Sequence, residues 1–202
     1  APHVYIEDPE GAFDEAIQLA GPGIVRTDPT GAGTLVFNGS ISDPQSAATL
    51  IRAGKHAVVI MGPGISAGVL TRLLDRPVTV DFRSSALSLA AAPGAAGRLV
   101  EGIAWNSAPQ LRERYVVLEP SLEPLILGFE TGEVVVGRLA VGAGSVLLVA
   151  PVLDGRANGS LRNWAYAHYL EYVLLGYPFW NDLQAFAEWP GSPVPHAAER
   201  MV

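Results

Sequence analysis

Apolar and polar positions follow two alternating patterns along the first 82 residues. Short, nearly continuous apolar runs predict strands buried on both faces of a parallel sheet, and these runs cover residues 3–8, 23–29, 34–39, 56–61 and 77–82. Between them, apolar residues at helical spacing predict helices over 11–20, 42–54 and 66–75. This alternation, with short connections, predicts an open, mostly parallel α/β sheet flanked by helices.

The helix over 42–54 carries clear end signals. Ser42 or Asp43 is placed to be its N-cap, and Pro44 follows in the first turn. Gly54 marks its end, because glycine accommodates the backbone conformation that commonly terminates a helix.

The second half of the chain has a different pattern. Residues 83–124 are rich in Ala, Gly and Pro and give no clear periodicity. Residues 125–151 hold apolar runs without an intervening helix, separated by turn residues around Gly132 and at 142–144. This pattern predicts an antiparallel meander whose last strand, 145–151, re-enters the sheet.

A further helix is predicted over 160–176, beginning at Ser160 and ending at Gly176. Its apolar positions follow helical spacing, so we expect one face to cover the sheet; that face consists of Leu161, Trp164, Ala165, His168, Tyr169 and Tyr172. We therefore predict a single α/β domain over residues 1–177, followed by an aromatic, proline-rich tail over 178–202.

Aromatic residues concentrate late in the chain, with nine of them between Trp164 and Trp189. In the helix they lie on more than one face, which indicates burial on two sides or contact with a partner. An ordinary core with a wrapped tail is one interpretation. A surface for a protein partner or for a membrane is the other.

Composition excludes several classes of function. The chain of 202 residues has a net charge of −7, which argues against nucleic-acid binding. It has no cysteine, so disulfides, thiolate catalysis and cysteine-based metal sites are excluded. Asp28, Asp81 and Asp154 fall near predicted strand ends, but turn and cap roles explain them better than a metal site. We therefore expect no metal and no cofactor.

One short motif has the pattern of a catalytic serine. Residues 64–68 read G-x-S-x-G, the turn that presents a nucleophilic serine between a strand and a helix. Here Gly62, Pro63 and Gly64 separate Ser66 from the preceding strand, so the serine falls where a helix N-cap is expected. The spacing favours the N-cap over the nucleophile.

A serine nucleophile also needs a base and an orienting acid. His3 and His56 stand at predicted strand starts, away from the edge where ligands bind in such sheets. His168 lies within the late helix, where a core or interface role is favoured, and His196 lies in the tail. No histidine follows the last strand in the order that a Ser-acid-His triad requires.

Two alternative functions stay open, one catalytic and one of ligand binding. The first is a serine hydrolase in which Ser66 recruits Asp154 and either His168 or His196 in space. The second is a binder of a small ligand or sugar at the carboxyl ends of the strands, using Ser66, Asn106 and Asp154.

The order of segments resembles a known family. The stretch LIRAGKHAVVIMGPGISAGVLTRLLDRPV and the later run from LVEGIAWNSAPQ to LLVAPVLDG resemble glutamine-amidotransferase-like domains in large bacterial membrane proteins of the BatA type. The similarity covers roughly residues 34–176. It implies a class I glutamine-amidotransferase-like, flavodoxin-related fold that is held outside the membrane by flanking spanning helices.

The departures from that family decide which properties carry over. Members with amidotransferase activity have a cysteine in a G-x-C-x-G turn and a His-x-Glu after the last strand, and this chain has neither. The resemblance therefore implies a fold and a setting but no catalytic residue. We expect a non-catalytic, extracytoplasmic interaction module that contacts a protein partner or a membrane-proximal surface. In the full-length protein we expect a spanning helix soon after residue 202 and another before residue 1.

Overall fold

The computed structural model describes residues 1–151 and 163–181 of the chain. Within these residues the strands are β1 (His3–Glu7), β2 (Val25–Arg26), β3 (Thr34–Ser40), β4 (His56–Gly64), β5 (Thr79–Arg83), β6 (Leu89–Ala91), β7 (Arg114–Leu118), β8 (Glu123–Gly128), β9 (Val134–Val141) and β10 (Gly144–Val149). The α-helices are α1 (Asp14–Ala20), α2 (Pro44–Arg52), α3 (Ala67–Leu74), α4 (Arg98–Glu101) and α6 (Ala167–Leu175). Short 3-10 helices are η1 (Gly21–Gly23), η2 (Trp105–Ser107) and η3 (Phe179–Asn181).

Eight strands form one sheet in the order β2-β1-β3-β4-β10-β9-β8-β6. The first five in this order run parallel, and β9, β8 and β6 continue the sheet in antiparallel pairing. Strand β10 re-enters the sheet between the two parts, pairing parallel with β4 and antiparallel with β9. The predicted α/β class, with a mostly parallel sheet and a C-terminal meander, is confirmed at this level.

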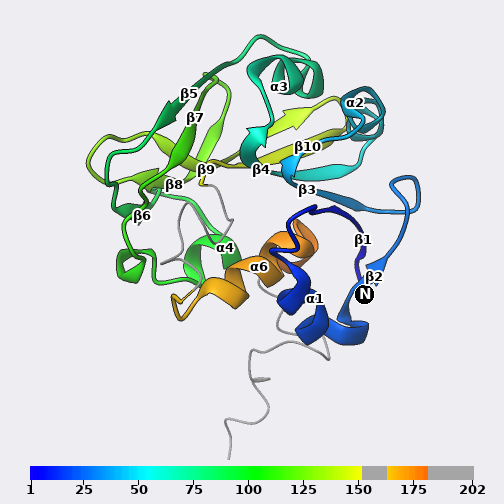
Figure 1. Cartoon of the computed structure of the whole chain (residues 1–202), viewed down its shortest axis with the longest axis horizontal. Helices are drawn as coiled ribbons and strands as arrows, with labels where there is room; N and C mark the ends of the chain where they lie inside the picture. Colours follow the sequence, from blue (N-terminus) through cyan, green and yellow to red (C-terminus); the bar gives the residue numbers. More distant parts are fainter. Residues whose placement is uncertain (152–162, 182–202) are drawn as a thin grey trace, which may run out of the picture.

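Helices cover both faces of the sheet (Figure 1). Because parallel strands here are buried on both sides, alternate residues of β4 face different clusters. Val58 and Ile60 pack with residues of α1, α4 and α6, whereas Val59 and Met61 pack with residues of α2 and α3. The α1/α6 face and the α2/α3 face are therefore two separate cores on opposite sides of one sheet.

The predicted end signals of α2 are largely confirmed. Asp43 is the N-cap, its carboxylate accepting a hydrogen bond from the Ser46 backbone N–H at 3.0 Å, and Pro44 is the first helical residue. Ser42, the other candidate, instead donates its backbone N–H to Glu7 at 2.7 Å. The helix ends one residue earlier than expected, with Gly54 just beyond the C-cap at φ +119°.

The sequence pattern predicted that β5 is the next strand of the parallel sheet, and this prediction was wrong. It pairs antiparallel with β7 in a separate two-stranded sheet, and β10 takes the place beside β4. The reason lies in the side chains: β5 alternates polar Asp81 with apolar Val80 and Phe82, which suits burial on one side. The position beside β4 requires apolar residues on both faces, as in residues 146–149 of β10.

The late helix differs from its prediction in length and in face. Within the described residues α6 begins at Ala167, and Ser160 and Leu161 lie outside them. The predicted inward face was wrong at two positions, because Ala165 is exposed and the His168 side chain is 48% exposed.

The buried residues of α6 instead include Leu170, Val173 and Leu174. Packing continues beyond residue 177, where Trp180 is fully buried. The last turn of the described chain therefore belongs to the core of the α1/α6 face.

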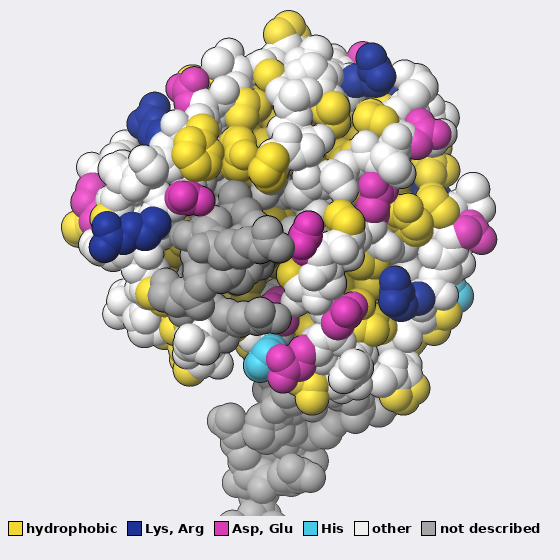
Figure 2. All heavy atoms as spheres, in the orientation of Figure 1, with side chains coloured by type: hydrophobic (Ala, Val, Ile, Leu, Met, Phe, Trp, Pro, Cys, Tyr) yellow, Lys and Arg dark blue, Asp and Glu magenta, His cyan; other side chains and the backbone are white. Residues whose placement is uncertain are grey.

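Several large apolar side chains stay exposed at the surface. Phe129 is 76% exposed, Phe82 55% and Leu118 51%. Figure 2 shows hydrophobic side chains gathered on the upper part of one face, while acidic and basic side chains stand singly around them. The charges on this face are spread out, unlike the basic stripe of a nucleic-acid-binding domain.

Candidate functional site

Ser66 is the N-cap of α3. Its Oγ accepts a hydrogen bond from the Val69 backbone N–H at 3.2 Å, and its backbone is extended at φ −82° and ψ 167°. A side-chain oxygen in this position satisfies one of the four backbone donors left open at a helix start. The N-cap role predicted for Ser66 is confirmed.

The turn before Ser66 is shaped by the close approach of β3 and β4. A Cβ at Gly62 would stand 2.6 Å from the Gly39 Cα, and one at Gly64 would stand 2.7 Å from the Gly39 carbonyl oxygen. Gly39 itself has φ +77° and interrupts the register between the two strands. Glycine is needed at these positions so that the strand ends can pack backbone against backbone.

The structure separates Ser66 from His168, one of the two histidines proposed for the alternative triad. Helix α3 lies on the α2/α3 face, whereas His168 belongs to α6 on the opposite face of the sheet (Figure 1). His168 lies near Glu171, with Nδ1 3.4 Å from Oε2, and near Glu15, with Nε2 3.7 Å from Oε1. Asp154 and His196, the other proposed members, lie outside the described residues.

The proposed ligand set is also divided. Asn106 lies in η2, whose neighbouring Trp105 packs into the core of the α1/α6 face. Ser66 follows β4, whereas η2 lies beside β6, and three strands separate β4 from β6 in the sheet, so these two residues do not share one pocket. Asp154 again lies outside the described residues.

A polar pair that the sequence analysis missed lies at the carboxyl ends of β1 and β3. Asp8 Oδ1 accepts a hydrogen bond from Asn38 Nδ2 at 2.8 Å, and Asp8 Oδ2 accepts one from the Phe13 backbone N–H at 2.8 Å. Asn38 is only 9% exposed. Strands β2 and β3 lie on opposite sides of β1, so the strand order reverses between β1 and β3. Open α/β sheets bind ligands at the carboxyl ends of the strands where such a reversal occurs.

In this arrangement the Asp8–Asn38 pair has a structural role. Both carboxylate oxygens of Asp8 already accept hydrogen bonds, so the group fixes the chain entering α1. The signal in the sequence was position alone: Asp8 directly follows a strand, and Asn38 lies near the end of its neighbour.

A second pair that the sequence analysis missed lies at the amino ends of the neighbouring strands β4 and β10. His56 begins β4 and Ser145 stands opposite it on β10, with the imidazole Nδ1 2.7 Å from the serine Oγ. Burial lowers the pKa of His56, so the ring is neutral at pH 7. Among the described residues this is the one serine hydroxyl within hydrogen-bond distance of an imidazole, and no described acid binds the other ring nitrogen.

Asp28 and Asp81 do not form a carboxylate cluster. Asp28 accepts hydrogen bonds from the backbone N–H groups of Thr30 and Gly31 at 2.8 and 2.9 Å, which is the turn role expected for it. Asp81 lies within β5 and pairs with Arg83 at 3.7 Å. Over residues 1–151 and 163–181, no three His, Asp or Glu side chains come together as metal ligands.

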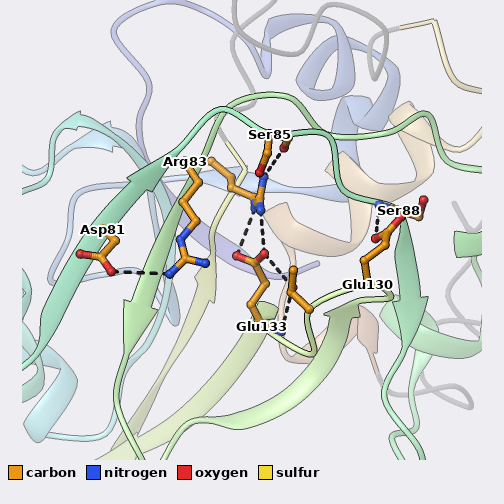
Figure 3. A network of polar contacts seen from close by, with 8 residues as sticks. Asp81, Arg83, Ser85, Ser88, Glu130 and Glu133 are labelled. Carbon is orange, nitrogen blue, oxygen red and sulfur yellow. Dashed lines mark hydrogen bonds and ion pairs between the residues drawn. The ribbon is translucent and has the colours of Figure 1, made fainter.

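The most buried ion pair of the described residues belongs to a polar network between the two sheets (Figure 3). Arg114 of β7 binds the Glu133 carboxylate through Nη2 at 2.7 Å and Nε at 3.1 Å, with side chains 1% and 8% exposed. Arg114 Nη1 also donates to the Ser85 carbonyl at 2.5 Å. Burial raises the pKa of Glu133, but hydrogen bonds from Arg114 and Thr131 outweigh this and hold it below its usual value.

The late aromatic residues are mostly core within the described chain. Trp164 is 9% exposed and lies 5.6 Å from the Trp105 ring centroid, and its Nε1–H donates to Ser107 Oγ at 3.1 Å. Tyr177 is 2% exposed, whereas Phe179 is 45% exposed. None of the helices in the described part of the chain is long and apolar enough to cross a bilayer.

Comparisons with known proteins give a likeness of fold. No protein-family model matches the chain, and no curated protein matches it in sequence. The cytoplasmic protein STM1381 of Salmonella typhimurium LT2 superposes with a TM-score of 0.63 at 11% identity, covering 86% of this chain and 96% of that one. The cytoplasmic protein STM3548 of Salmonella typhimurium gives 0.63 at 9% identity, covering 84% of this chain and 96% of its own.

Parts of larger enzymes share the same architecture. The exo-β-1,4-mannosidase Op5Man5 of Opitutaceae bacterium strain TAV5 has a TM-score of 0.56 at 13% identity, covering 87% of this chain but 35% of that enzyme. At such identities the likeness is one of fold alone. The fold therefore occurs both as nearly a whole chain and as about a third of a longer one.

Proposed function

We propose that this chain is a non-catalytic interaction module, a degenerate class I glutamine-amidotransferase-like domain that contacts a protein partner or a membrane-proximal surface. One observation carries the proposal. The G-x-S-x-G motif has the pattern of a catalytic turn, but the Ser66 hydroxyl caps α3 by accepting a hydrogen bond from the Val69 backbone N–H. Among the described residues it has no other hydrogen-bond partner. A serine without a base keeps its proton and is a poor nucleophile.

The state of the other polar groups supports the same proposal. The Asp8 carboxylate is held between two donors, and Arg114 is held by Glu133 and a backbone carbonyl. Groups engaged in this way stabilise the fold. Exposed Phe82, Leu118 and Phe129 supply the apolar area that protein interfaces use.

The setting that we propose is extracytoplasmic and tethered to a membrane in the full-length protein. Its support is the sequence resemblance over residues 34–176 to domains of bacterial membrane proteins of the BatA type. Fractionation of cells that express the native gene, followed by protease treatment of intact spheroplasts, tests it. The protein should sediment with membranes and be cleaved from outside, and recovery in the cytosolic fraction would contradict the setting.

An activity-based probe tests the absence of catalysis. We expect no labelling of the purified chain by a fluorophosphonate and no hydrolysis of p-nitrophenyl esters above buffer. Labelling that disappears in Ser66→Ala would overturn the proposal. Ser40→Ala, which removes another hydroxyl at the same edge of the sheet, is the matched control.

A serine hydrolase that uses Ser145 in place of Ser66 is the second candidate, and the His56–Ser145 contact of 2.7 Å is the observation that favours it. A neutral imidazole in that position can accept the serine proton. The pair lies at the amino end of parallel strands, however, where the Ser145 backbone N–H is already donated to the Lys55 carbonyl. Labelling that is lost in Ser145→Ala and kept in Ser66→Ala would establish this candidate.

A further inference from the structure

Strand β5 has one partner strand and one open edge. It pairs with β7 alone in the two-stranded sheet and lies at the outside of the molecule (Figure 1). Four of its five residues are exposed. Among the other edge strands of the described structure, β2 has two residues and β6 has three. Strand β7 has five, but residues 150 and 151 occupy part of its outer side, through the Tyr115–Ala150 hydrogen bond and the Arg114–Pro151 bridge. An exposed strand edge of this length presents unpaired N–H and C=O groups to another strand.

The side chains of β5 suit pairing with a second strand. The Phe82 ring is 55% exposed and contacts Tyr115 of β7 edge-on, with ring centroids 5.2 Å apart. Figure 2 shows hydrophobic side chains gathered on the upper part of the molecule, where Figure 1 places the small sheet. A strand added beside β5 would cover the open side of Phe82.

The charges on β5 are complementary to those of an identical strand. Asp81 and Arg83 flank Phe82, and their side chains are 48% and 45% exposed. In an antiparallel pair with a two-fold axis at Phe82, Asp81 of each copy lies opposite Arg83 of the other. Phe82 then meets Phe82 of the second copy on the other face. Pairing centred on Asp81 or on Arg83 would instead put like charges opposite each other, which is unfavourable.

We propose that β5 pairs antiparallel with β5 of a second copy of this chain, so that the partner of the interaction surface is the protein itself. This inference rests on the proposed function as an interaction module and names its partner. The interface is self-complementary, with one aromatic pair at the axis and one ion pair on each side of it. The Asp81–Arg83 contact at 3.7 Å within one copy is replaced by contacts between copies.

Sedimentation equilibrium of the purified chain over a range of concentrations tests the proposal. We expect a reversible dimer for the unchanged protein. Asp81→Arg and Arg83→Asp should each weaken the dimer by about tenfold or more, because each puts like charges opposite at two symmetric positions. The double variant Asp81→Arg/Arg83→Asp restores complementarity and should recover most of the affinity.

The control is Arg26→Asp, which reverses a charge on the exposed edge strand β2 and should leave the dimer unchanged. Circular dichroism and a thermal melt show that each variant is folded. A monomeric unchanged protein, or a dimer that neither single reversal weakens, would overturn the pairing. Either result leaves the non-catalytic assignment intact, because that assignment depends on labelling and hydrolysis.

Discussion

The Arg114–Glu133 pair allows a direct test of how the small sheet is attached to the large one. Arg114→Met removes a guanidinium that is 1% exposed and leaves the Glu133 carboxylate buried, with Thr131 as its remaining hydrogen-bond donor. It also leaves the Ser85 carbonyl without this donor. Removing one partner of a buried ion pair costs about 3–5 kcal/mol, so we expect a loss of that size in the free energy of unfolding.

The dependence on pH has a definite sign. In the unchanged protein the pKa of Glu133 lies below its usual value of 4.5, so its contribution to stability is present at neutral pH and is lost as the pH falls below that value. In Arg114→Met, burial raises the pKa instead, and protonation relieves an unpaired charge. The difference in stability between the two proteins should therefore shrink on acidification from pH 7 toward pH 5.

Urea denaturation followed by tryptophan fluorescence measures both effects. Glu123→Gln is the control: the Arg138–Glu123 pair also has two hydrogen bonds, at 2.7 and 3.1 Å, but its side chains are 41% and 56% exposed, and Arg138 keeps its contact with Tyr177. This substitution should lower the free energy of unfolding by less than about 1 kcal/mol. The double variant Arg114→Met/Glu133→Leu should recover most of the stability, because no charge is left buried. A loss below about 1 kcal/mol in Arg114→Met would refute the reasoning.

Three further predictions use the same measurement. Ser66→Ala should cost about 0.5–2 kcal/mol and Ser66→Asp much less, because aspartate also caps helices well; equal losses would contradict the cap. Trp164→Ala should cost about 3–5 kcal/mol, the range for a buried tryptophan, and a loss below about 1 kcal/mol would place this side chain on the surface. Because burial lowers the pKa of His56 below its usual 6.5, stability should fall as the pH drops below that value. His56→Gln should remove this decline, and His3→Gln, at an exposed position, should not.

Features that depend on neighbouring residues could be predicted from the sequence. The caps at Asp43 and Ser66 follow from a polar residue just before an apolar helical run, and both are confirmed. The turns at Gly132 and Gly142, with φ +71° and +59°, follow from glycine between two apolar runs. In each case the signal and the structure lie within a few residues of each other.

Features that depend on pairing between distant segments could not be predicted. His56 and Ser145 meet because β4 and β10 are adjacent and in register, although 89 residues separate them in the sequence. Arg114 and Glu133 meet because β7, which lies outside the main sheet, passes beside the start of β9. Periodicity shows that a strand exists and which of its faces is buried, but it does not specify the neighbour.

The two glycines of the G-x-S-x-G motif give a last test, because the structure assigns them different roles. A Cβ at Gly64 would stand 2.7 Å from the Gly39 carbonyl oxygen, and backbone there cannot yield without disturbing the β3–β4 pairing. Gly64→Ala should therefore cost about 1–3 kcal/mol, as overpacking does. A Cβ at Gly68 would meet only Ser66 Oγ at 3.7 Å, an ordinary contact, and the residue lies inside α3.

Gly68→Ala should accordingly be neutral or stabilise the protein by up to about 1 kcal/mol, because alanine favours the helix. Urea denaturation of the two variants, at matched concentration, gives the comparison. In a nucleophile turn both glycines would be needed for the close packing of strand against helix, and both substitutions would be costly. A loss at Gly68→Ala as large as that at Gly64→Ala would contradict the N-cap account of this turn. Opposite signs would show that the motif arises from two unrelated requirements, strand packing at Gly64 and helix initiation at Ser66.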